Sequence, residues 1–578
     1  MKKRIVIILS TIGLTVVIYS CKKAFLDQPP QGVYDLASLT NKKGIDGMLI
    51  NAYATLDGIQ GQQNGGASNW LWGSIRGGEA YKGTEPSDMS EANPIMRFEL
   101  TPSNGQMNNK WNGIWDGVGA ANQVLSVLPN VKDLTAADAK QIEAEAKFIR
   151  AFQLFEGKKA FGNVPFIDEK VKDFKQANFS GAAYVNIWPQ IESDLQFAYA
   201  NLDETKQHKG RVNKWAAAAF LAKAYMFQNK FTEAKALFDA IITNGKNSQG
   251  QKYQLTATYQ TNFRALTENN TETVFSIQAS YGDGANTNGN YDNTLNYPHN
   301  GSANDKPGAC CGFFQPSQNM VNAFRTSVLG LPLPTTYNDL DVTSDETVTS
   351  LQPFTPYAGT LDPRLDWTVG RRGIPYYDWG IHPGRDWIRK VDYGGPYSPK
   401  KNTYYKADIG TLAGTVGWGF ANNALNYTPM RFADVLLLAA EAEIEVGSLE
   451  VARTYINMVR TRAANSPVMN GAATAANYLC NTYAVPFVSK AEAQTAVRFE
   501  RRLELGMEGH RFFDLVRWGV ADVFLNTEYF PKEGTRRVEA LGGSNFTKGK
   551  HELLPIPEFA VTNSIKDGAP TLKQNPGY

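Results

Sequence analysis

Two segments, residues 212–246 and 432–463, place small and large apolar residues at the offsets by which tetratricopeptide helix pairs pack together. The first segment carries Ala222, Tyr225, Ala234 and Phe238, and the second carries Ala440, Ala452 and Ile456. One such pair cannot bury its apolar face alone, so roughly three or more pairs must stack. The pattern therefore predicts a mainly α, tetratricopeptide-like helical-repeat scaffold.

Helical periodicity extends this scaffold to neighbouring segments. Apolar residues at helical spacing predict further helices over residues 108–128, 136–161 and 184–202. The repeats are therefore expected at about residues 108–247 and 430–520.

Two long, loop-rich insertions, at about residues 60–106 and 253–428, interrupt the predicted repeats. Within the second insertion, residues 281–305 hold seven asparagines, four glycines and three tyrosines, which is a loop composition. Residues 367–405 combine tryptophans and tyrosines with glycines and prolines in short, strand-like pieces. We expect a small amount of β-structure there, with aromatic loops.

The first twenty residues have the features of a bacterial export signal. Lys2, Lys3 and Arg4 precede an apolar stretch, residues 5–19, that is too short to span a membrane. Ser20 before Cys21 completes a sequence similar to a lipobox, so we expect Cys21 to become the lipidated first residue of the mature chain. The alternative is an ordinary secretory signal followed by an incidental cysteine. Several acyl chains at Cys21 would anchor the protein stably to a membrane.

Composition favours one large domain, residues 21–578, behind this signal, because no long linker interrupts the chain. Removing residues 1–20 takes away three of the 58 basic residues and none of the 56 acidic ones, which leaves a net charge of −1. A chain with this balance is not expected to bind nucleic acid.

The sequence contains no catalytic or metal-binding motif that we recognise, such as a nucleophile elbow, a phosphate-binding loop or a zinc signature. Its five histidines are scattered without ligand spacing, so a metal-centred enzyme is not expected. Besides Cys21, the chain has the adjacent Cys310 and Cys311, and Cys480. Neighbouring cysteines rarely bridge each other, whereas an oxidising compartment would permit a disulfide from Cys480 to one of them.

Residues 69–81 hold the side chains that a sugar-binding site needs. Aromatic rings can stack on the flat faces of sugars, and guanidiniums, amides and carboxylates can bind pairs of hydroxyls. The candidate glycan-binding residues are Trp70, Trp72, Arg76 and Tyr81, with Tyr291 and Tyr297 of the asparagine-rich loop as second candidates. The alternative for Trp70 and Trp72 is that they anchor the loop to the core.

Residues 499–519, FERRLELGMEGHRFFDLVRWG, combine four arginines, three glutamates, one aspartate and one histidine with apolar residues. Phe499, Leu503 and Met507 share one face of a predicted helix, and the three-residue spacing of Arg501 and Glu504 permits an ion pair. Glu508, His510 and Asp514 could suggest an active site, but no nucleophile accompanies them. We expect a structural charge network.

This segment resembles the C-terminal signature of the SusD/RagB family, in which an ERRLE-like helix runs into an EGHR-FFDL-RWG turn. Residues 430–463 and 552–578 match the same family in the same order. Residues 77–88, GGEAYKGTEPSD, and the later Trp111, Trp115 and Asn122 are similar to a further family pattern.

The resemblance implies an outer-membrane lipoprotein, lipid-anchored and facing the cell surface, that binds oligosaccharides and delivers them to a TonB-dependent SusC-like transporter. It implies no enzymatic activity and no cofactor; Glu79, Glu85 and Asp88 would permit a structural calcium, which their spacing does not predict. Three alternatives stay open: a helical-repeat adaptor that binds only proteins, a RagB-like peptide-binding protein, and a surface glycosidase.

Overall fold

The structure is a computed structural model that describes residues 39–57, 68–284, 289–290, 295–299, 307, 310–416 and 420–578. Cys21 and Tyr291 lie outside the described residues. Among the described helices, none combines the length and the apolar character needed to cross a bilayer.

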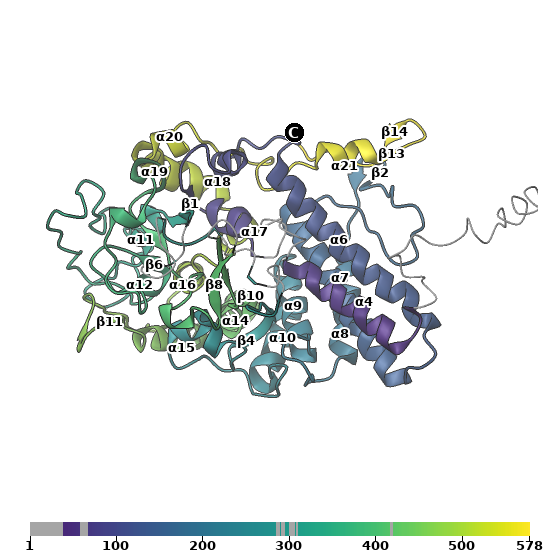
Figure 1. Ribbon diagram of the computed structural model, residues 1–578. Helices are drawn as coiled ribbons and strands as arrows, with labels where there is room; N and C mark the ends of the chain where they lie inside the picture. The colour runs from purple at the N-terminus through teal and green to yellow at the C-terminus, as the bar shows by residue number, and fades with distance from the viewer. Residues whose placement is uncertain are drawn as a thin grey trace, which may run out of the picture.

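A row of helices forms one side of the molecule (Figure 1). In chain order it consists of α4 (Lys42–Ala54), α6 (Gly105–Val127), α7 (Ala136–Ala160), α8 (Trp188–Asn201), α9 (Lys214–Met226) and α10 (Phe231–Asn244). From α6 onward each helix contacts the next, and α4 packs against α6 and α7. The row continues with helices that come much later in the chain: α14 (Phe432–Val446), α15 (Leu449–Ala464) and α16 (Lys490–Glu504). Because α10 contacts α14 directly, both predicted repeat segments belong to one helical layer, and the mainly α, tetratricopeptide-like fold is confirmed.

Polar side chains fix where several of these helices begin. Thr135 accepts a hydrogen bond from the Asp138 amide at the start of α7, and Asn213 accepts one from Ala216 at the start of α9. Ser489 does the same for Glu492 in α16. Each cap satisfies an amide that the first helical turn would leave without a partner.

The remaining α-helices among the described residues are shorter. They are α5 (Asn93–Arg97), α11 (Gln318–Ala323), α12 (Leu365–Thr368), α13 (Val391–Gly394), α17 (Arg511–Arg517), α18 (Ala521–Val523), α19 (Phe530–Arg536), α20 (Val538–Leu541) and α21 (Glu558–Asn563). In Figure 1, α11 and α12 lie at the end opposite α6 and α8, within the large insertion.

The described β-structure consists of two-stranded antiparallel pairs, so the expected small amount of β is confirmed. Two pairs join distant segments: β1 (Ala80–Gly83) pairs with β5 (Phe313–Pro316), and β4 (Thr273–Ile277) pairs with β10 (Tyr427–Arg431). The others are β2 (Phe179–Ser180) with β3 (Ala183–Tyr184), β6 (Val369–Gly370) with β7 (Ser398–Pro399), β8 (Ala413–Val416) with β9 (Phe420–Asn423), β11 (Met469–Asn470) with β12 (Ala473–Thr474), and β13 (Ile565–Lys566) with β14 (Ala569–Pro570).

The β4–β10 pair fastens the large insertion to the helical layer. Phe275 of β4 packs its ring 5.2 Å from that of Phe148 in α7 and 6.1 Å from that of Phe220 in α9, in edge-to-face arrangements. Such contacts add to the free energy gained by burying the rings. Both ends of the insertion are therefore held at the core, close to one another.

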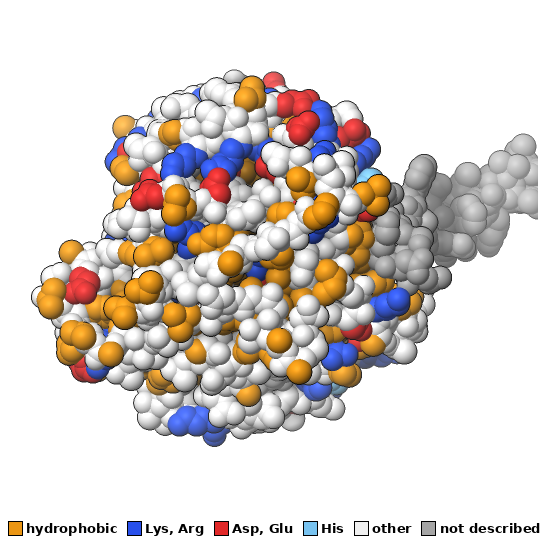
Figure 2. Space-filling model, turned by 90° about the vertical axis from the view of Figure 1, so that its left-hand side faces the viewer, with side chains coloured by type: hydrophobic (Ala, Val, Ile, Leu, Met, Phe, Trp, Pro, Cys, Tyr) orange, Lys and Arg blue, Asp and Glu red, His pale blue; other side chains and the backbone are white. Residues whose placement is uncertain are grey.

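Figure 2 shows the end of the molecule that carries α11 and α12. Lysines and arginines gather with acidic residues toward the upper part of this face, while apolar side chains are spread among uncharged ones. The described surface on this side therefore has no extended field of one sign that would steer a polyanion toward it.

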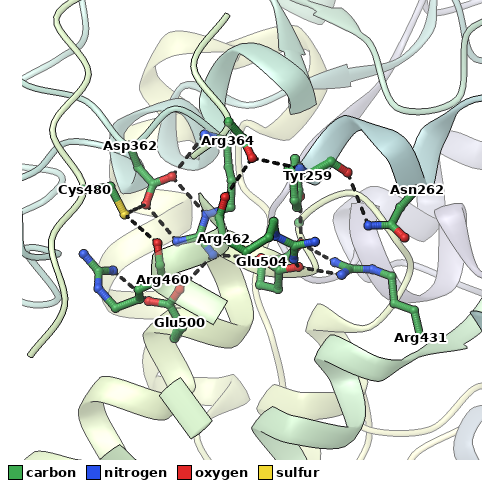
Figure 3. A network of polar contacts seen from close by, with 12 residues as sticks. Tyr259, Asn262, Asp362, Arg364, Arg431, Arg460, Arg462, Cys480, Glu500 and Glu504 are labelled. Carbon is green, nitrogen blue, oxygen red and sulfur yellow. Dashed lines mark hydrogen bonds and ion pairs between the residues drawn. The ribbon is translucent and has the colours of Figure 1, made fainter. Parts of the chain in front are cut away.

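Residues 499–519 belong to a buried charge network, and Figure 3 shows the part of it around Glu500 and Glu504. Glu504, the last residue of α16, accepts hydrogen bonds from the guanidiniums of Arg364, Arg431 and Arg462. Burial alone would raise the pKa of Glu504, but the three guanidiniums hold it well below its usual range. Glu500, one turn earlier, contacts Arg364 at 2.7 Å and Arg460 at 2.9 Å. The expected structural network is present.

The ion pairs of Arg501 within this network differ from the pair with Glu504 that their three-residue spacing suggests. Arg501 contacts Asp434 at 2.7 Å and Asp514 at 2.9 Å, so it is not the main partner of Glu504. The helix also ends at Glu504, and Met507 has a backbone φ of +66°, so Met507 does not continue the apolar face of α16. Helical spacing identifies only near neighbours, whereas folding brought Asp434 of α14 beside α16.

Of the three residues that could suggest an active site, Asp514 and Glu508 are paired with cations. Asp514 lies between Arg501 and Arg517, and Glu508 contacts Arg431 at 2.9 Å and Lys401 at 2.7 Å. Both carboxylates are therefore occupied by cations of the protein itself.

Candidate functional site

Most of the aromatic residues proposed as sugar platforms are buried. Trp72 exposes 1% of its surface, Tyr81 none and Tyr297 1%. Tyr81 donates its hydroxyl hydrogen bond to Glu533, and the Tyr297 hydroxyl lies 3.9 Å from the sulfur of Cys311. A ring without an accessible face cannot stack on a sugar, so the expectation that these side chains are exposed platforms is wrong.

Arg76 is likewise part of the interior. Its guanidinium lies between the rings of Phe98 and Phe512, 4.9 and 4.2 Å from their centroids, and donates to the carbonyl of His551 at 2.5 Å. Burial lowers its pKa to about 10. The residue links the N-terminal and C-terminal parts of the chain from a buried position.

A close backbone crossing explains why residues 70–76 are buried. They form a π-helical turn, Trp70–Ile75, that packs against α17. A Cβ atom at Gly73 would lie only 1.8 Å from the carbonyl oxygen of Gly509. The sequence places Trp70 and Trp72 in a loop, but their contact with residues 499–519 holds them in the core.

Trp70 differs from the other candidates because it borders a pocket. It exposes 4% of its surface, and its indole N–H has no hydrogen-bond partner in the described part of the chain. Its ring contacts those of Phe313 and Phe314 edge-on. The indole nitrogen is itself buried, so its N–H is not open to the pocket.

We call this cavity the amide pocket because asparagines dominate its wall. Those lining it are Asn262, Asn270, Asn290, Asn402 and Asn426. The space between the lining atoms, including its mouth, is about 750 Å³. That figure counts open solvent at the mouth; the space that the centre of a water molecule can reach is about 60 Å³.

The pocket also has aromatic and charged residues in its wall. Trp70, Phe263 and Tyr427 supply aromatic surface, and Tyr427 is half-buried. The charged lining residues are Glu268, Lys401, Arg431 and Glu508. Amides, carboxyls and rings together form the set of groups that bind polyhydroxylated ligands.

The elements around the pocket come from three distant parts of the chain. Asn290 donates to the carbonyl of Leu425 at 2.6 Å, and the backbone amide of Asn426 donates to Glu268 at 3.0 Å. Thr428 of β10 shares a hydrogen bond of 2.6 Å with Ser276 of β4. The β4–β10 pair therefore holds the two ends of the insertion so that their asparagines face one cavity.

Two carboxyl groups line the pocket, those of Glu268 and Glu508. Glu508 contacts Lys401 and Arg431, whereas Glu268 has no ion pair or hydrogen bond with a lysine or arginine among the described residues. Burial raises its pKa to about 8, although the Asn426 amide and the more distant Lys209 lower it. At neutral pH this carboxyl is therefore mostly protonated, and it can donate as well as accept a hydrogen bond.

Among the candidate glycan-binding residues that the structure describes, only Trp70 lines the amide pocket. The asparagines stand at positions from 262 to 426, and nothing in their spacing indicates that they meet. The one available signal was the density of asparagines at 422, 423 and 426, directly before the strand that the structure shows as β10.

The aromatic loops expected at residues 367–405 pack on themselves. Tyr377 stacks on Tyr405, with ring centroids 4.3 Å apart, and on Trp367 at 6.3 Å. Arg264 covers the Tyr405 ring at 4.3 Å. Because these faces are occupied by neighbours within the protein, the column contributes to the core of the insertion.

The acidic loop near residue 85 is filled by cations of the chain. The ammonium group of Lys82 donates to the carbonyls of Glu85 at 2.7 Å and Asp88 at 2.5 Å. Arg389 contacts the carboxylates of the same two residues at 2.8 and 2.6 Å. No cluster of metal-ligating side chains is found among the described residues.

The cysteines pair differently from the expectation. Cys310 and Cys311 form a disulfide with each other, and Cys480 is free and buried. The thiol of Cys480 lies 3.4 Å from a carboxylate oxygen of Asp362 within the buried charge network. The suggested bridge from Cys480 to the adjacent pair is therefore not formed.

Comparison with protein families gives two matches that together span most of the chain. The model of the SusD family matches residues 271–578, and a model described as "starch-binding associating with outer membrane" matches residues 37–226. SusD-like protein P2 of Formosa agariphila is 25% identical over 490 residues, covering 84% of this chain and 83% of that protein. A SusD-like protein of Bacteroides ovatus is 23% identical over 600 residues, covering 98% of this chain and 94% of that protein.

Solved structures share the fold at low sequence identity. A laminarin-binding SusD-like protein superimposes with a TM-score of 0.63 at 23% identity, covering 93% of this chain and 100% of that one. Surface glycan-binding protein A from Bacteroides thetaiotaomicron, solved in complex with laminarihexaose, gives a TM-score of 0.61 at 19% identity, covering 93% of this chain and 99% of that one. The family model matches more than half of this chain, so the chain belongs to the SusD family.

Proposed function

We propose that this protein binds oligosaccharides at the cell surface and delivers them to a TonB-dependent SusC-like transporter in the outer membrane. The observation that carries the binding function is the amide pocket, where asparagine amides, the protonated carboxyl of Glu268 and aromatic surface from Phe263 and Tyr427 face one cavity. Planar polar groups beside rings suit ligands with many hydroxyls and flat C–H faces. The glycans named for solved relatives support the same ligand class.

The pocket supports binding better than hydrolysis. Glycosidases use two carboxyl groups with separated pKa values, and Glu268 and Glu508 line the same pocket. However, both oxygens of Glu508 accept hydrogen bonds, one from Lys401 and Arg431 and the other from Arg431. Because these hydrogen bonds occupy both of its oxygens, Glu508 is unsuited to attack a sugar or activate water.

Membrane attachment is proposed from the sequence and the family. Lipidation of Cys21 would hold the mature chain at the outer membrane, in agreement with the family description as starch-binding and associating with the outer membrane. The anchor, the exposure at the cell surface and the transporter partner are parts of this proposal. We propose no cofactor.

Ligand binding is tested with the mature chain purified without its lipid. We expect it to bind glycans on an array that includes laminarin oligosaccharides, and to release no reducing ends from the glycans it binds. If the protein ignores every glycan but co-purifies with a transporter barrel, a protein-binding adaptor is the better description. Capture of peptides without glycan binding would favour a RagB-like function.

Attachment is tested by replacing the predicted lipidation site. We expect Cys21→Ala to abolish labelling with a radioactive fatty acid and to move the protein from the outer-membrane fraction to the soluble fraction. Membrane attachment that persists in this variant would contradict the proposed anchor.

A further inference from the structure

The disulfide between Cys310 and Cys311, here called the vicinal bridge, joins two neighbouring residues. In the chain-entropy description, a disulfide stabilises a fold by restricting the unfolded chain, and the restriction grows with the number of residues that the bridge encloses. The vicinal bridge encloses no residue between its cysteines, so it restricts the unfolded chain less than any bridge between distant residues. Its contribution to the folded protein must therefore be local.

The residues that follow the vicinal bridge hold two other segments of the chain. The carbonyl of Gly312 accepts a hydrogen bond of 2.6 Å from the backbone amide of Thr84, directly after β1. The backbone amide of Phe313, the first residue of β5, donates to the carbonyl of Leu295 at 3.2 Å. The vicinal bridge therefore stands where β1, β5 and residues 295–299 meet, and we call this place the β5 junction.

The surroundings of the vicinal bridge are packed on one side and more open on the other. Cys311 exposes 2% of its surface, and its sulfur lies 3.9 Å from the hydroxyl of Tyr297, whereas Cys310 is half-buried. A Cβ atom at Gly312 would lie only 2.9 Å from the Cβ of His299. When the S–S bond opens, the two sulfurs must separate to van der Waals contact and each gains a hydrogen. A packed interior accommodates such a change only if neighbouring segments shift.

The β5 junction also supports one wall of the amide pocket. The rings of Phe313 and Phe314 lie 6.3 and 5.6 Å from the ring of Trp70, in edge-to-face arrangements. Trp70 in turn lines the amide pocket. Because these rings are in contact within a close-packed core, a displacement of β5 is transmitted to this wall.

We propose that the vicinal bridge is a redox switch, and that its reduction by a dithiol loosens the β5 junction and the adjoining wall of the amide pocket. A thiolate of the dithiol attacks the sulfur of the half-buried Cys310, the S–S bond breaks, and the sulfur of Cys311 leaves as a thiolate that takes up a proton. The second thiol of the reductant then attacks the mixed disulfide, frees Cys310 as a thiol and leaves the reductant as a disulfide. The protein thereby gains two electrons and two protons.

The first experiment reduces the folded, mature chain that carries Cys21→Ala. We expect about 10 mM dithiothreitol at about pH 8 to make Cys310 and Cys311 available to a thiol reagent, while the buried Cys480 stays unlabelled. A vicinal bridge that resists this treatment until the whole protein unfolds would contradict the proposed switch.

Hydrogen exchange then measures the β5 junction in the oxidised and reduced protein. We expect backbone amides of residues 81–84 and 313–316 to exchange about tenfold faster or more after reduction, while those of α8 keep their rates. The melting temperature should fall by only about 3 °C or less, because the effect is local. Unchanged exchange at the β5 junction, or a loss of protection throughout the protein, would overturn the inference.

A variant without the vicinal bridge provides the matched control. The double substitution Cys310→Ser and Cys311→Ser, in the same Cys21→Ala chain, should show fast exchange at the β5 junction with and without dithiothreitol. A response of this variant to the reductant would mean that the effect arises elsewhere in the protein, and the redox switch would be refuted. The comparison of oxidised and reduced parent does not depend on the folding of this variant.

The consequence for binding rests on the proposed glycan-binding function. For a glycan that the oxidised protein binds, we expect reduction to weaken the affinity by about fivefold or more. An affinity that stays constant while the β5 junction loosens would contradict the link to the amide pocket. If the oxidised protein binds no glycan, the proposed function fails, and hydrogen exchange still decides whether the vicinal bridge controls the β5 junction.

Discussion

The carboxyl group of Glu268 shows how burial changes the chemistry of one residue. Its pKa rises to about 8 because the charged form loses its water in the amide pocket, where the Asn426 amide gives only partial compensation. The neighbouring Glu508 has its pKa lowered instead, because Arg431 and Lys401 outweigh the effect of burial. Two glutamates in one pocket therefore carry different charges at neutral pH.

This difference predicts how stability depends on pH. Between the unfolded value of 4.5 and the folded value of about 8, folded Glu268 keeps a proton that the unfolded chain has lost. The folded state then binds more protons, so the contribution of this group to the free energy of unfolding falls as pH rises through that window. Glu268→Gln removes this loss, and we expect the variant to gain on the order of 4 kcal/mol relative to the parent between about pH 5 and pH 9.

Urea unfolding at several pH values measures this gain. Glu539→Gln, in an exposed pair with Lys390, serves as the control and should show no comparable trend. A difference between Glu268→Gln and the parent that stays constant with pH would contradict the assignment.

At the scale of elements, α16 is held by charges that come from several other segments. Glu504 contacts Arg364 of the insertion, Arg431 at the end of β10 and Arg462 of α15. All four side chains are buried, so each depends on the others for the hydrogen bonds that water would otherwise supply.

We therefore expect Glu504→Gln to lower the free energy of unfolding by about 3–5 kcal/mol, because removing one partner leaves buried guanidiniums without compensation. Chemical denaturation measures the change. The exposed Glu539→Gln again provides the control, with little effect expected. A small effect of Glu504→Gln would show that the network is not important for stability.

The crossing of the π-helical turn and α17 gives a second prediction at this scale. A Cβ atom at Gly73 would collide with the backbone of Gly509, so Gly73→Ala should cost about 2–4 kcal/mol of stability. Gly119 of α6 has open space around its Cβ position. Gly119→Ala should therefore be neutral or stabilise the protein by up to about 1 kcal/mol, because alanine favours the helix. Equal effects of the two substitutions on the melting temperature would refute the close crossing.

At the scale of the whole molecule, one helical layer is assembled from two parts of the chain, and the large insertion is closed by β4 and β10 at their junction. The amide pocket lies at this closure, between the insertion and the signature segment that supplies Met507 and Glu508. Binding residues on loops are thus positioned by a rigid helical scaffold.

The cysteine pairing is a testable property of the whole fold. We expect the Cys21→Ala protein, which has no thiol at the predicted lipidation site, to be unreactive toward a thiol reagent when folded, because Cys480 is buried and burial raises the pKa of its thiol. After denaturation of this variant without reductant, one equivalent of reagent should label Cys480, and mass spectrometry should find Cys310 and Cys311 in one internally bonded peptide. A peptide that links Cys480 to either of them would contradict the structure.

Local patterns were sufficient for much of the fold. The expected helices at 136–161 and 432–463 correspond to α7, α14 and α15 within a few residues, because apolar periodicity and caps act over short distances. The end of α16 was missed because Met507 leaves the helix where the chain turns toward the charge network.

The sequence by itself was sufficient for the helical-repeat scaffold and the signature segment, and it is the sole basis for the predicted export signal and lipidation at Cys21, since each depends on residues close together in the chain. Only the tertiary structure decided that Trp72 and Tyr81 are core residues and that asparagines 262, 402 and 426 meet in one pocket. The physical reason is that exposure and cavity composition depend on contacts between segments hundreds of residues apart. A sequence pattern cannot distinguish an aromatic residue that stacks on a sugar from one that fills the core.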